Sequence, residues 1–194
     1  MATIFIIHGS YGNPQENWFP WLKKQLEKDG HRVFVPQFPV PDVQDSAYGG
    51  HDLSAWQRTL HEYDQYVTEE TIFVAHSRGC VFLYRVLEEL KKPVRAVFFV
   101  APWARYRWYP KNWKTPDSFH KTSFDWEKIK RGSRHFDVYQ STNDEIPVSE
   151  GKEISRTLGA TLHIVTKAGH FNVANDPKYV SFAQLYADVL MQLV

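Results

Sequence analysis

The sequence predicts an α/β fold, a three-layer sandwich in which a mostly parallel sheet lies between helices. Short apolar runs typical of buried strands alternate along the whole chain with segments whose apolar residues recur at helical spacing. Such alternation favours parallel strands with helices on both faces. The chain has 194 residues and no repeat, low-complexity segment or linker, so we expect a single domain over residues 1–194.

Six strands are expected, each a short apolar run bounded by polar or turn-forming residues. They cover residues 3–7, 31–35, 71–75, 95–100, 135–140 and 161–165. The helices expected between them carry apolar residues at intervals of three and four. They cover residues 14–29, 52–67, 78–90, 124–129, 147–158 and 177–190.

Boundary residues support the helices in chain order. Asn13 is a suitable cap for a first helix that has Pro14 at its opening position, and Gly30 is a suitable end. Asp52 or Ser54 can begin the second helix. The preceding residues are rich in proline and contain a Gly-Gly pair, which favours a loop.

The strongest local pattern lies in residues 71–80, Thr-Ile-Phe-Val-Ala-His-Ser-Arg-Gly-Cys. A buried strand turns there into a helix, with Ser77 at the turn, as a nucleophile elbow requires. A tight turn strains the serine backbone and crowds the positions two before and two after it. Those positions hold the small residues Ala75 and Gly79. The alternative is an N-cap serine on an ordinary core helix.

Composition excludes several classes of function. The formal net charge is +1, from 23 basic and 22 acidic residues, which gives no general attraction for nucleic acid or an anionic membrane. The one cysteine, Cys80, cannot form an intrachain disulfide and fits a reducing compartment. No apolar run approaches a membrane span, and the N-terminal run is typical of a strand and not of a signal peptide. We therefore expect a cytoplasmic protein.

Residues 101–122 form the least regular part of the chain and interleave aromatic with basic residues. This pattern can stack nucleic-acid bases, but one short patch on a near-neutral chain is a poor electrostatic footprint. We instead expect a loop over the rim of a pocket. Trp103, Trp108 and Tyr11 are the residues expected to line that substrate pocket.

Three chemically complementary residues follow three separate strands, in the order serine, acid, histidine. A serine nucleophile needs a neutral histidine as base, and a carboxylate to fix the tautomer of that histidine. Ser77, Asp144 and His170 supply these groups from loops that a parallel sheet brings to one edge. Glu145 is an alternative acid, but Asp144 is nearer the end of its strand. His76 is interpreted as structural, because the turn directs its side chain away from Ser77.

Two backbone N–H groups are expected to form an oxyanion hole. One belongs to Arg78, which follows the nucleophile, and the other to the loop after the first strand. His8-Gly9 lets the backbone pass close there, so Ser10 is the expected donor and Tyr11 the alternative.

Several segments together carry a family resemblance. They are His8-Gly9, residues 18–24 (Trp-Phe-Pro-Trp-Leu-Lys-Lys), His76-Ser77-Arg78-Gly79, residues 124–129 (Phe-Asp-Trp-Glu-Lys-Ile), Asn143-Asp144-Glu145-Ile146-Pro147 and Gly169-His170-Phe171. With them the chain resembles the α/β-hydrolase superfamily, and more narrowly the small lidless serine hydrolases grouped with retinoblastoma-binding protein nine. The resemblance covers nearly the whole chain.

The resemblance implies that Ser77 is the nucleophile, Asp144 the acid and His170 the base. It also implies an α/β-hydrolase fold truncated at its N-terminus and without a cap domain. The chain departs from the family pattern at two positions. Ala75 replaces the usual glycine, and Arg78 occupies a position that is more often apolar, where its charge would steer an anionic acyl group or point to solvent.

We expect a serine hydrolase that cleaves small carboxylic esters through an acyl-enzyme, with no metal or other cofactor. Two alternatives remain open: hydrolysis of a thioester or small amide, and a protein-binding module with a slow or vestigial triad. A metal site is a weaker alternative, because no His-x-x-x-His or Cys-x-x-Cys spacing occurs. Such a metal site would require His8, His76 and His170 to converge at one edge of the sheet. No nucleic-acid or membrane partner is expected, and no protein partner is indicated.

Overall fold

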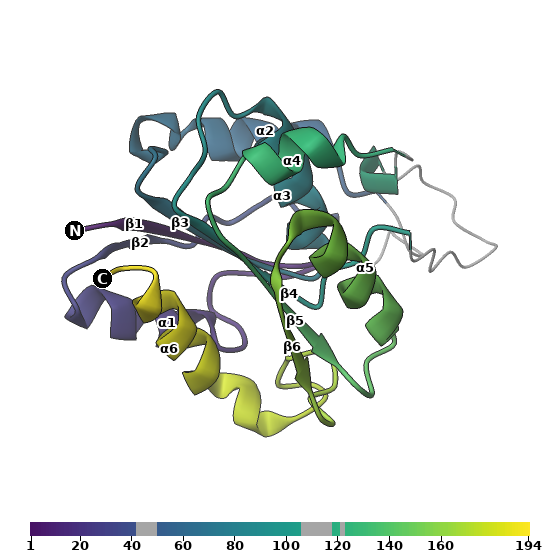
Figure 1. The fold of residues 1–194 in the computed structure, drawn as a ribbon. Coiled ribbons are helices and arrows are strands. Elements are labelled where there is room, and N and C mark those ends of the chain that lie inside the picture. The colour runs from purple at the N-terminus through teal and green to yellow at the C-terminus, as the bar shows by residue number, and fades with distance from the viewer. Residues whose placement is uncertain (42–49, 106–117, 121–122) are drawn as a thin grey trace.

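A six-stranded parallel sheet is the centre of the molecule (Figure 1). The computed structural model describes residues 1–41, 50–105, 118–120 and 123–194. The strand order is β2-β1-β3-β4-β5-β6, and every neighbouring pair is parallel. This arrangement confirms the predicted α/β class.

The strands agree with the predicted runs to within one or two residues. They are β1 Thr3–Ile7, β2 Arg32–Phe34, β3 Thr71–His76, β4 Ala96–Val100, β5 Phe136–Ser141 and β6 Thr161–Val165. The α-helices are α1 Phe19–Lys28, α2 Leu53–His61, α3 Arg78–Glu89, α4 Trp126–Arg131, α5 Val148–Leu158 and α6 Ala183–Met191. The short 3₁₀ helices are η1 Asp64–Tyr66, η2 Ser118–His120 and η3 Pro177–Val180.

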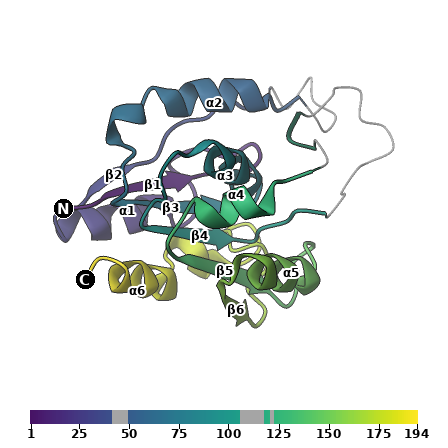
Figure 2. The same cartoon turned by 45° about the horizontal axis from the view of Figure 1, so that its top comes forward.

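Helices cover both faces of the sheet. Figures 1 and 2 show α1 and α6 together on one face, with α2, α3 and α4 on the other. Strand β1 illustrates why both faces are covered. Its side chains alternate, so Ile4 and Ile6 pack under α1 and α6, whereas Phe5 and Ile7 pack with the apolar residues of α2–α5. A strand that is apolar on both faces needs a helical layer on each side.

The boundaries of the first two helices differ from the prediction. Helix α1 begins at Phe19 and not at Pro14, because the Asn13 side chain accepts the Gln15 N–H at 2.9 Å and forms a local turn instead of a cap. The second helix is shorter than predicted, since α2 ends at His61 and only the short η1 follows.

The terminal helix is also interrupted. Asp176 caps η3 by accepting the Lys178 N–H at 3.0 Å, and the chain is extended again at Ser181. The break lets Phe182 turn into the core, where its ring lies 5.5 Å from that of Phe171. Burial of this ring therefore prevails over helical continuity.

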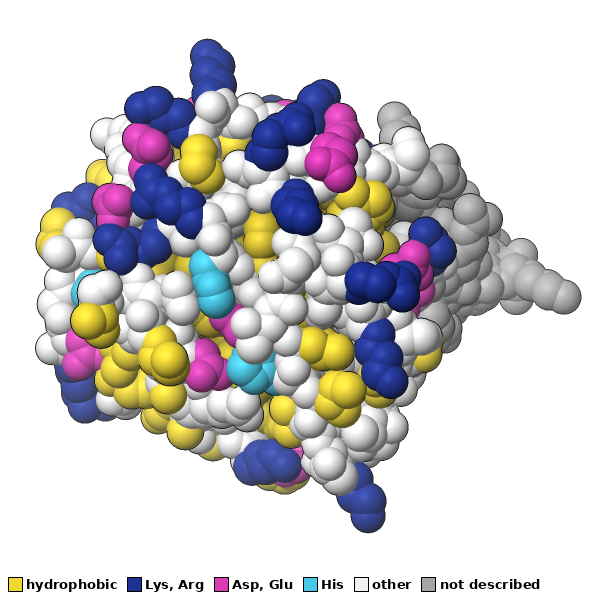
Figure 3. Space-filling model, in the orientation of Figure 1, with side chains coloured by type: hydrophobic (Ala, Val, Ile, Leu, Met, Phe, Trp, Pro, Cys, Tyr) yellow, Lys and Arg dark blue, Asp and Glu magenta, His cyan; other side chains and the backbone are white. Residues whose placement is uncertain are grey.

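Charged side chains of both signs are mixed over the face seen in Figure 3. Within the described part of the chain, no helix has the length and apolar character needed to cross a membrane. Cys80 is buried, and its Sγ–H lies 3.2 Å from the carbonyl oxygen of Ala75. It therefore packs in the core, as expected for a small apolar residue.

Candidate active site

Four loops meet at the edge of the sheet where the parallel strands end. The register pairs Ile7 with Ala75, and His76 with Val100, so β1, β3 and β4 finish close to one level. The loops after β1, β3, β5 and β6 carry the residues singled out from the sequence. A site outside the carboxyl ends of the strands is usual for an open α/β sheet.

Ser77 occupies a strained turn between β3 and α3. Its φ is 54° and its ψ is −120°, a conformation that a non-glycine residue adopts only when its surroundings enforce it. The Ser77 N–H donates to the Val100 carbonyl at 2.9 Å and ties the turn to β4. Close packing against the end of β1 also holds it, because a Cβ on Gly79 would lie 2.6 Å from the His8 carbonyl oxygen. The crowding predicted at this position is therefore present.

Asp144 and His170 are in direct contact. The His170 Nδ1 lies 3.0 Å from Asp144 Oδ1 and 2.9 Å from Oδ2. The Asp144 side chain is fully buried, while that of His170 remains 16% exposed. Because a carboxylate only accepts, Nδ1 carries the shared proton, and in the neutral imidazole Nε2 has the lone pair. Glu145, the alternative acid, is exposed.

The two loops that carry this pair are fastened together. Three backbone N–H groups after β6 donate to three consecutive side chains at the end of β5. The bonds are Lys167 N to Thr142 Oγ1 at 3.0 Å, Ala168 N to Ser141 Oγ at 3.0 Å, and Gly169 N to Asn143 Oδ1 at 2.8 Å. The relative position of Asp144 and His170 is thus fixed by the backbone of both loops.

His76 joins the elbow to the histidine loop. Its Nε2 lies 2.8 Å from the carbonyl oxygen of His170, and its ring centroid lies 4.9 Å from that of His170. A carbonyl can only accept, so Nε2 carries the proton. Burial, together with the neighbouring His170, lowers the His76 pKa to about 3. These contacts agree with the structural role predicted for His76. Its partner, the carbonyl of His170, could not be predicted from any local pattern in the sequence.

His76 links the Ser77 turn to the His170 loop, whereas the Ser77 and His170 side chains are not joined directly. Within the described residues, no hydrogen bond joins the Ser77 hydroxyl to the His170 ring. Catalytic hydrogen bonds are often long in a free enzyme and tighten when substrate binds.

The loop after β1 lies beside Ser77. A Cβ on Gly9 would lie 3.0 Å from the Ser77 Cβ, so this backbone can approach only because Gly9 has no side chain. The N–H of Tyr11 is already paired with His51 Nε2 at 3.3 Å, whereas no described acceptor pairs with that of Ser10. Of the two N–H groups considered as oxyanion donors, only that of Ser10 has no acceptor among the described residues.

Comparison with known proteins identifies the family. A family model described as serine hydrolase matches residues 4–187, nearly the whole chain. The chain belongs to the serine hydrolase family. It is 34% identical over 190 residues to YdeN of Bacillus subtilis (strain 168), covering 96% of this chain and 93% of that protein. It is 28% identical over 172 residues to the serine hydrolase RBBP9 of Rattus norvegicus, covering 88% and 86%.

Solved structures agree with this assignment. The crystal structure of the ydeN gene product from B. subtilis superposes with a TM-score of 0.84 at 30% identity, covering 100% of this chain and 99% of that one. Est1E from Butyrivibrio proteoclasticus, bound to ferulic acid, has a TM-score of 0.70 at 14% identity, covering 100% and 90%. At that identity the likeness extends to the fold alone. These neighbours confirm the expected α/β-hydrolase fold.

In this serine hydrolase, the structure describes two of the three residues that were predicted to line the substrate pocket. Tyr11 is 38% exposed and stands beside Ser10, with its ring 4.7 Å from that of His51. Trp103 is half-buried and packs against the core. Trp108 lies outside the residues that the structure describes.

Of the two alternatives expected for the Arg78 side chain, the structure excludes one. Its side chain does not point to solvent, since the residue is only 6% exposed. Its Nε donates to Ser10 Oγ at 2.7 Å, and its guanidinium carbon lies 5.2 Å from the centre of the Phe119 ring. The sequence marks Arg78 as unusual for the family but does not indicate these partners.

The three histidines considered for a metal site, His8, His76 and His170, all form hydrogen bonds within the protein. His8 donates from Nδ1 to the Gly9 carbonyl and accepts the Phe38 N–H at Nε2, and burial lowers its pKa. His76 and His170 have the partners given above. Among the described residues, no three His, Cys, Asp or Glu side chains are grouped to hold a metal ion.

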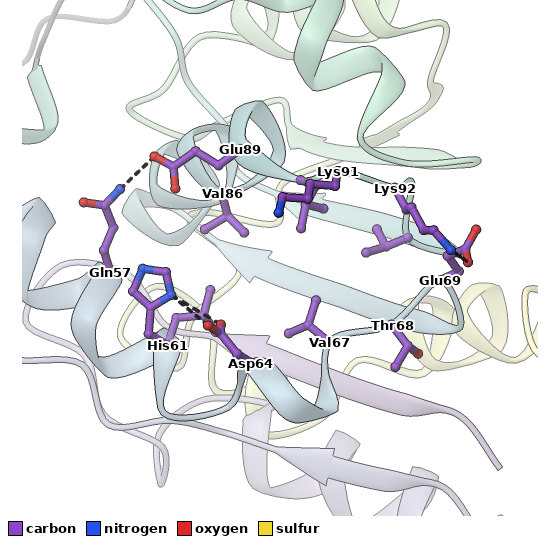
Figure 4. A pocket seen from close by; sticks show the side chains of 13 residues that line it. Gln57, His61, Asp64, Val67, Thr68, Glu69, Val86, Glu89, Lys91 and Lys92 are labelled. Atoms are coloured by element: carbon purple, nitrogen blue, oxygen red, sulfur yellow. Dashed lines mark hydrogen bonds and ion pairs between the residues drawn. The ribbon is translucent and has the colours of Figure 1, made fainter.

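A separate cavity of about 620 Å³ lies between α2, η1 and α3 (Figure 4). Aliphatic residues such as Val67 and Val86 form its floor, and paired groups such as Lys92 and Glu69 stand at its rim. Residue 69 precedes β3, whereas Ser77 follows β3. The cavity therefore lies at the opposite edge of the sheet and is not part of the candidate active site.

Proposed function

We propose that this serine hydrolase cleaves small carboxylic esters through an acyl-enzyme, with Ser77 as nucleophile, His170 as base and Asp144 as acid. One observation carries the proposal. The buried Asp144 carboxylate binds His170 Nδ1 through both oxygens, so the unprotonated Nε2 is available to a nucleophile. Supporting it, His76 fastens the histidine loop to the strained Ser77 turn.

The reaction follows from these positions. His170 Nε2 removes the hydroxyl proton as Ser77 Oγ attacks the ester carbonyl, and Asp144 stabilises the resulting imidazolium. The backbone N–H groups of Arg78 and Ser10 stabilise the oxyanion. His170 then protonates the departing alcohol and activates a water molecule, which releases the acid from Ser77.

Two features of α3 favour attack at Ser77. The amino end of a helix presents unpaired N–H groups, so developing negative charge is stabilised there. The strained Ser77 backbone also holds the side chain at the turn instead of along the helix. Tyr11 and Trp103 are the described residues that we propose line the substrate pocket.

The decisive experiment is covalent labelling of the folded protein with a fluorophosphonate, read by mass spectrometry of the modified peptide. We expect one label, on Ser77, and none in Ser77→Ala. Hydrolysis of p-nitrophenyl esters with increasing acyl length, measured on both proteins, should then give the acyl preference. Parallel thioester and anilide substrates would distinguish the ester from the thioester and amide alternatives.

Failure of labelling would contradict the proposal. If the folded wild-type protein does not react at Ser77, the site is vestigial and a binding role becomes the better interpretation. Circular dichroism of the same sample, showing a native spectrum, would exclude misfolding as the reason.

A further inference from the structure

The Arg78 side chain is buried at a position where helix stability does not favour it. A cation at the first residue of a helix opposes the partial positive charge of that end, and burial of a guanidinium loses hydration. Arg78 nevertheless is only 6% exposed at the start of α3. Its contacts with segments remote in the sequence offset these costs.

Two contacts of the side chain lie within the described residues and connect it to remote segments. The Nε–H donates to Ser10 Oγ at 2.7 Å, a charge-assisted bond across 68 positions of sequence. The guanidinium lies over the face of Phe119, which is 2% exposed and packs 5.0 Å from the ring of Trp56. The arginine therefore connects the loop after β1 to the buried aromatic cluster around η2.

Ser10 lies in a tight turn of the loop after β1. The Gly12 N–H donates to the Gly9 carbonyl at 3.3 Å, and Tyr11 has a positive φ of 54°. Ser10 itself is exposed, so packing does not fix it. Its hydroxyl accepts from Arg78, while its N–H has no acceptor among the described residues.

We infer that Arg78 is a positioning residue that sets the second oxyanion donor. Its backbone N–H is one donor, and its side chain holds Ser10, whose N–H is the other. One residue thereby fixes the spacing between both donors. This inference rests on the proposed function, because it assigns the oxyanion geometry of that reaction.

A matched pair of variants tests the inference. Arg78→Met places a methyl group where Nε stands, and Arg78→Gln places an amide nitrogen at the same distance along the side chain. Removing an oxyanion donor costs about 10²–10³ in kcat, so displacing one should cost about tenfold. We expect that loss in Arg78→Met with little change in KM, and recovery of most of it in Arg78→Gln.

Ser10→Ala supplies the second arm, because it removes the hydroxyl acceptor, keeps the backbone N–H and changes an exposed residue. We expect a loss similar to that in Arg78→Met, and a loss in the double variant smaller than the sum of the two, since both changes break the bond between Arg78 Nε and Ser10 Oγ. Inhibition constants of an alkylboronic acid, which forms a tetrahedral adduct on serine, should rise in step with the fall in kcat/KM.

The outcomes separate this inference from the proposed function. A wild-type protein that neither hydrolyses esters nor reacts with the fluorophosphonate overturns both. An active wild type with additive losses in the double variant, with Arg78→Gln as impaired as Arg78→Met, or with unchanged boronate binding, overturns the inference alone. Activities are compared well below each variant's Tm, so a loss caused by unfolding is recognised as such.

Discussion

His76 donates its Nε2–H to the backbone carbonyl of His170 at 2.8 Å, so the residue before Ser77 holds the loop that carries the proposed base. Trp18 supports the same loop, with its Nε1–H donating to the Phe171 carbonyl at 3.1 Å. The His76 ring also lies 6.0 Å from that of Phe19. An imidazole buried in this apolar setting has a lowered pKa, so the stability of the folded protein depends on pH.

The first prediction concerns stability in acid. The His76 pKa is about 3 in the folded protein and 6.5 ordinarily, so between these values the unfolded chain takes up a proton that the folded protein excludes. Stability should therefore fall as pH decreases from 6.5 towards 3, with His76 contributing up to about 1.4 kcal/mol per pH unit. Urea denaturation from pH 7 to pH 4 measures the slope. In His76→Asn the slope should be shallower, and an unchanged slope would refute the assignment.

The second prediction distinguishes two adjacent acids. Asp144→Asn replaces an acceptor oxygen with an amide and permits the wrong tautomer of His170, so kcat should fall by about 10³–10⁴. Glu145→Gln is the matched control: its side chain is exposed, and its kcat should be that of the wild type. Ester hydrolysis at pH 8 provides the measurement. Comparable losses in both variants would contradict the choice of Asp144.

The third prediction concerns the contact between α3 and β1. Alanine in a helix normally stabilises relative to glycine, yet a Cβ on Gly79 would lie 2.6 Å from the His8 carbonyl oxygen and 2.8 Å from that of Ile7. Gly79→Ala should therefore lower the unfolding free energy by about 2 kcal/mol or more and reduce labelling of Ser77.

Gly30→Ala is the control for this change. Gly30 has a φ of 85°, and a Cβ added there would meet no atom within 4 Å, so the substitution should cost about 1–2 kcal/mol through backbone strain alone. Ser77 labelling should persist in Gly30→Ala. Normal labelling in Gly79→Ala would show that the elbow tolerates the extra carbon.

The fourth prediction concerns the connection between the two loops. Asn143→Ala removes the oxygen that accepts the Gly169 N–H at 2.8 Å, one residue before His170. We expect kcat to fall about tenfold, because small displacements of a catalytic group are costly. Asn143→Asp keeps an acceptor oxygen and should recover most of the rate. If Asn143→Ala retains full activity, the remaining two bonds suffice to hold the loop.

Local patterns predict much of this structure because local interactions determine it. The strand and helix positions follow from periodicity, and the Ser77 turn from its small neighbours Ala75 and Gly79. Other features depend on tertiary contacts that have no local signal. The break before α6 exists because Phe182 packs into the core, and the path of Arg78 depends on Ser10, which is remote in sequence. From the sequence, Asp144 could be chosen over Glu145 as the acid only because it lies nearer the end of its strand.

Strand β6 forms one margin of the sheet and pairs with β5 alone in the described topology, whereas β3 lies in the middle. The His170 imidazole thus lies on the loop after an outermost strand, and the Ser77 hydroxyl lies just after an interior strand. Marginal strands fray at lower free energy than interior strands. We therefore expect gentle warming to lower the activity reversibly before the molecule unfolds, so that this edge strand limits the temperature range of activity.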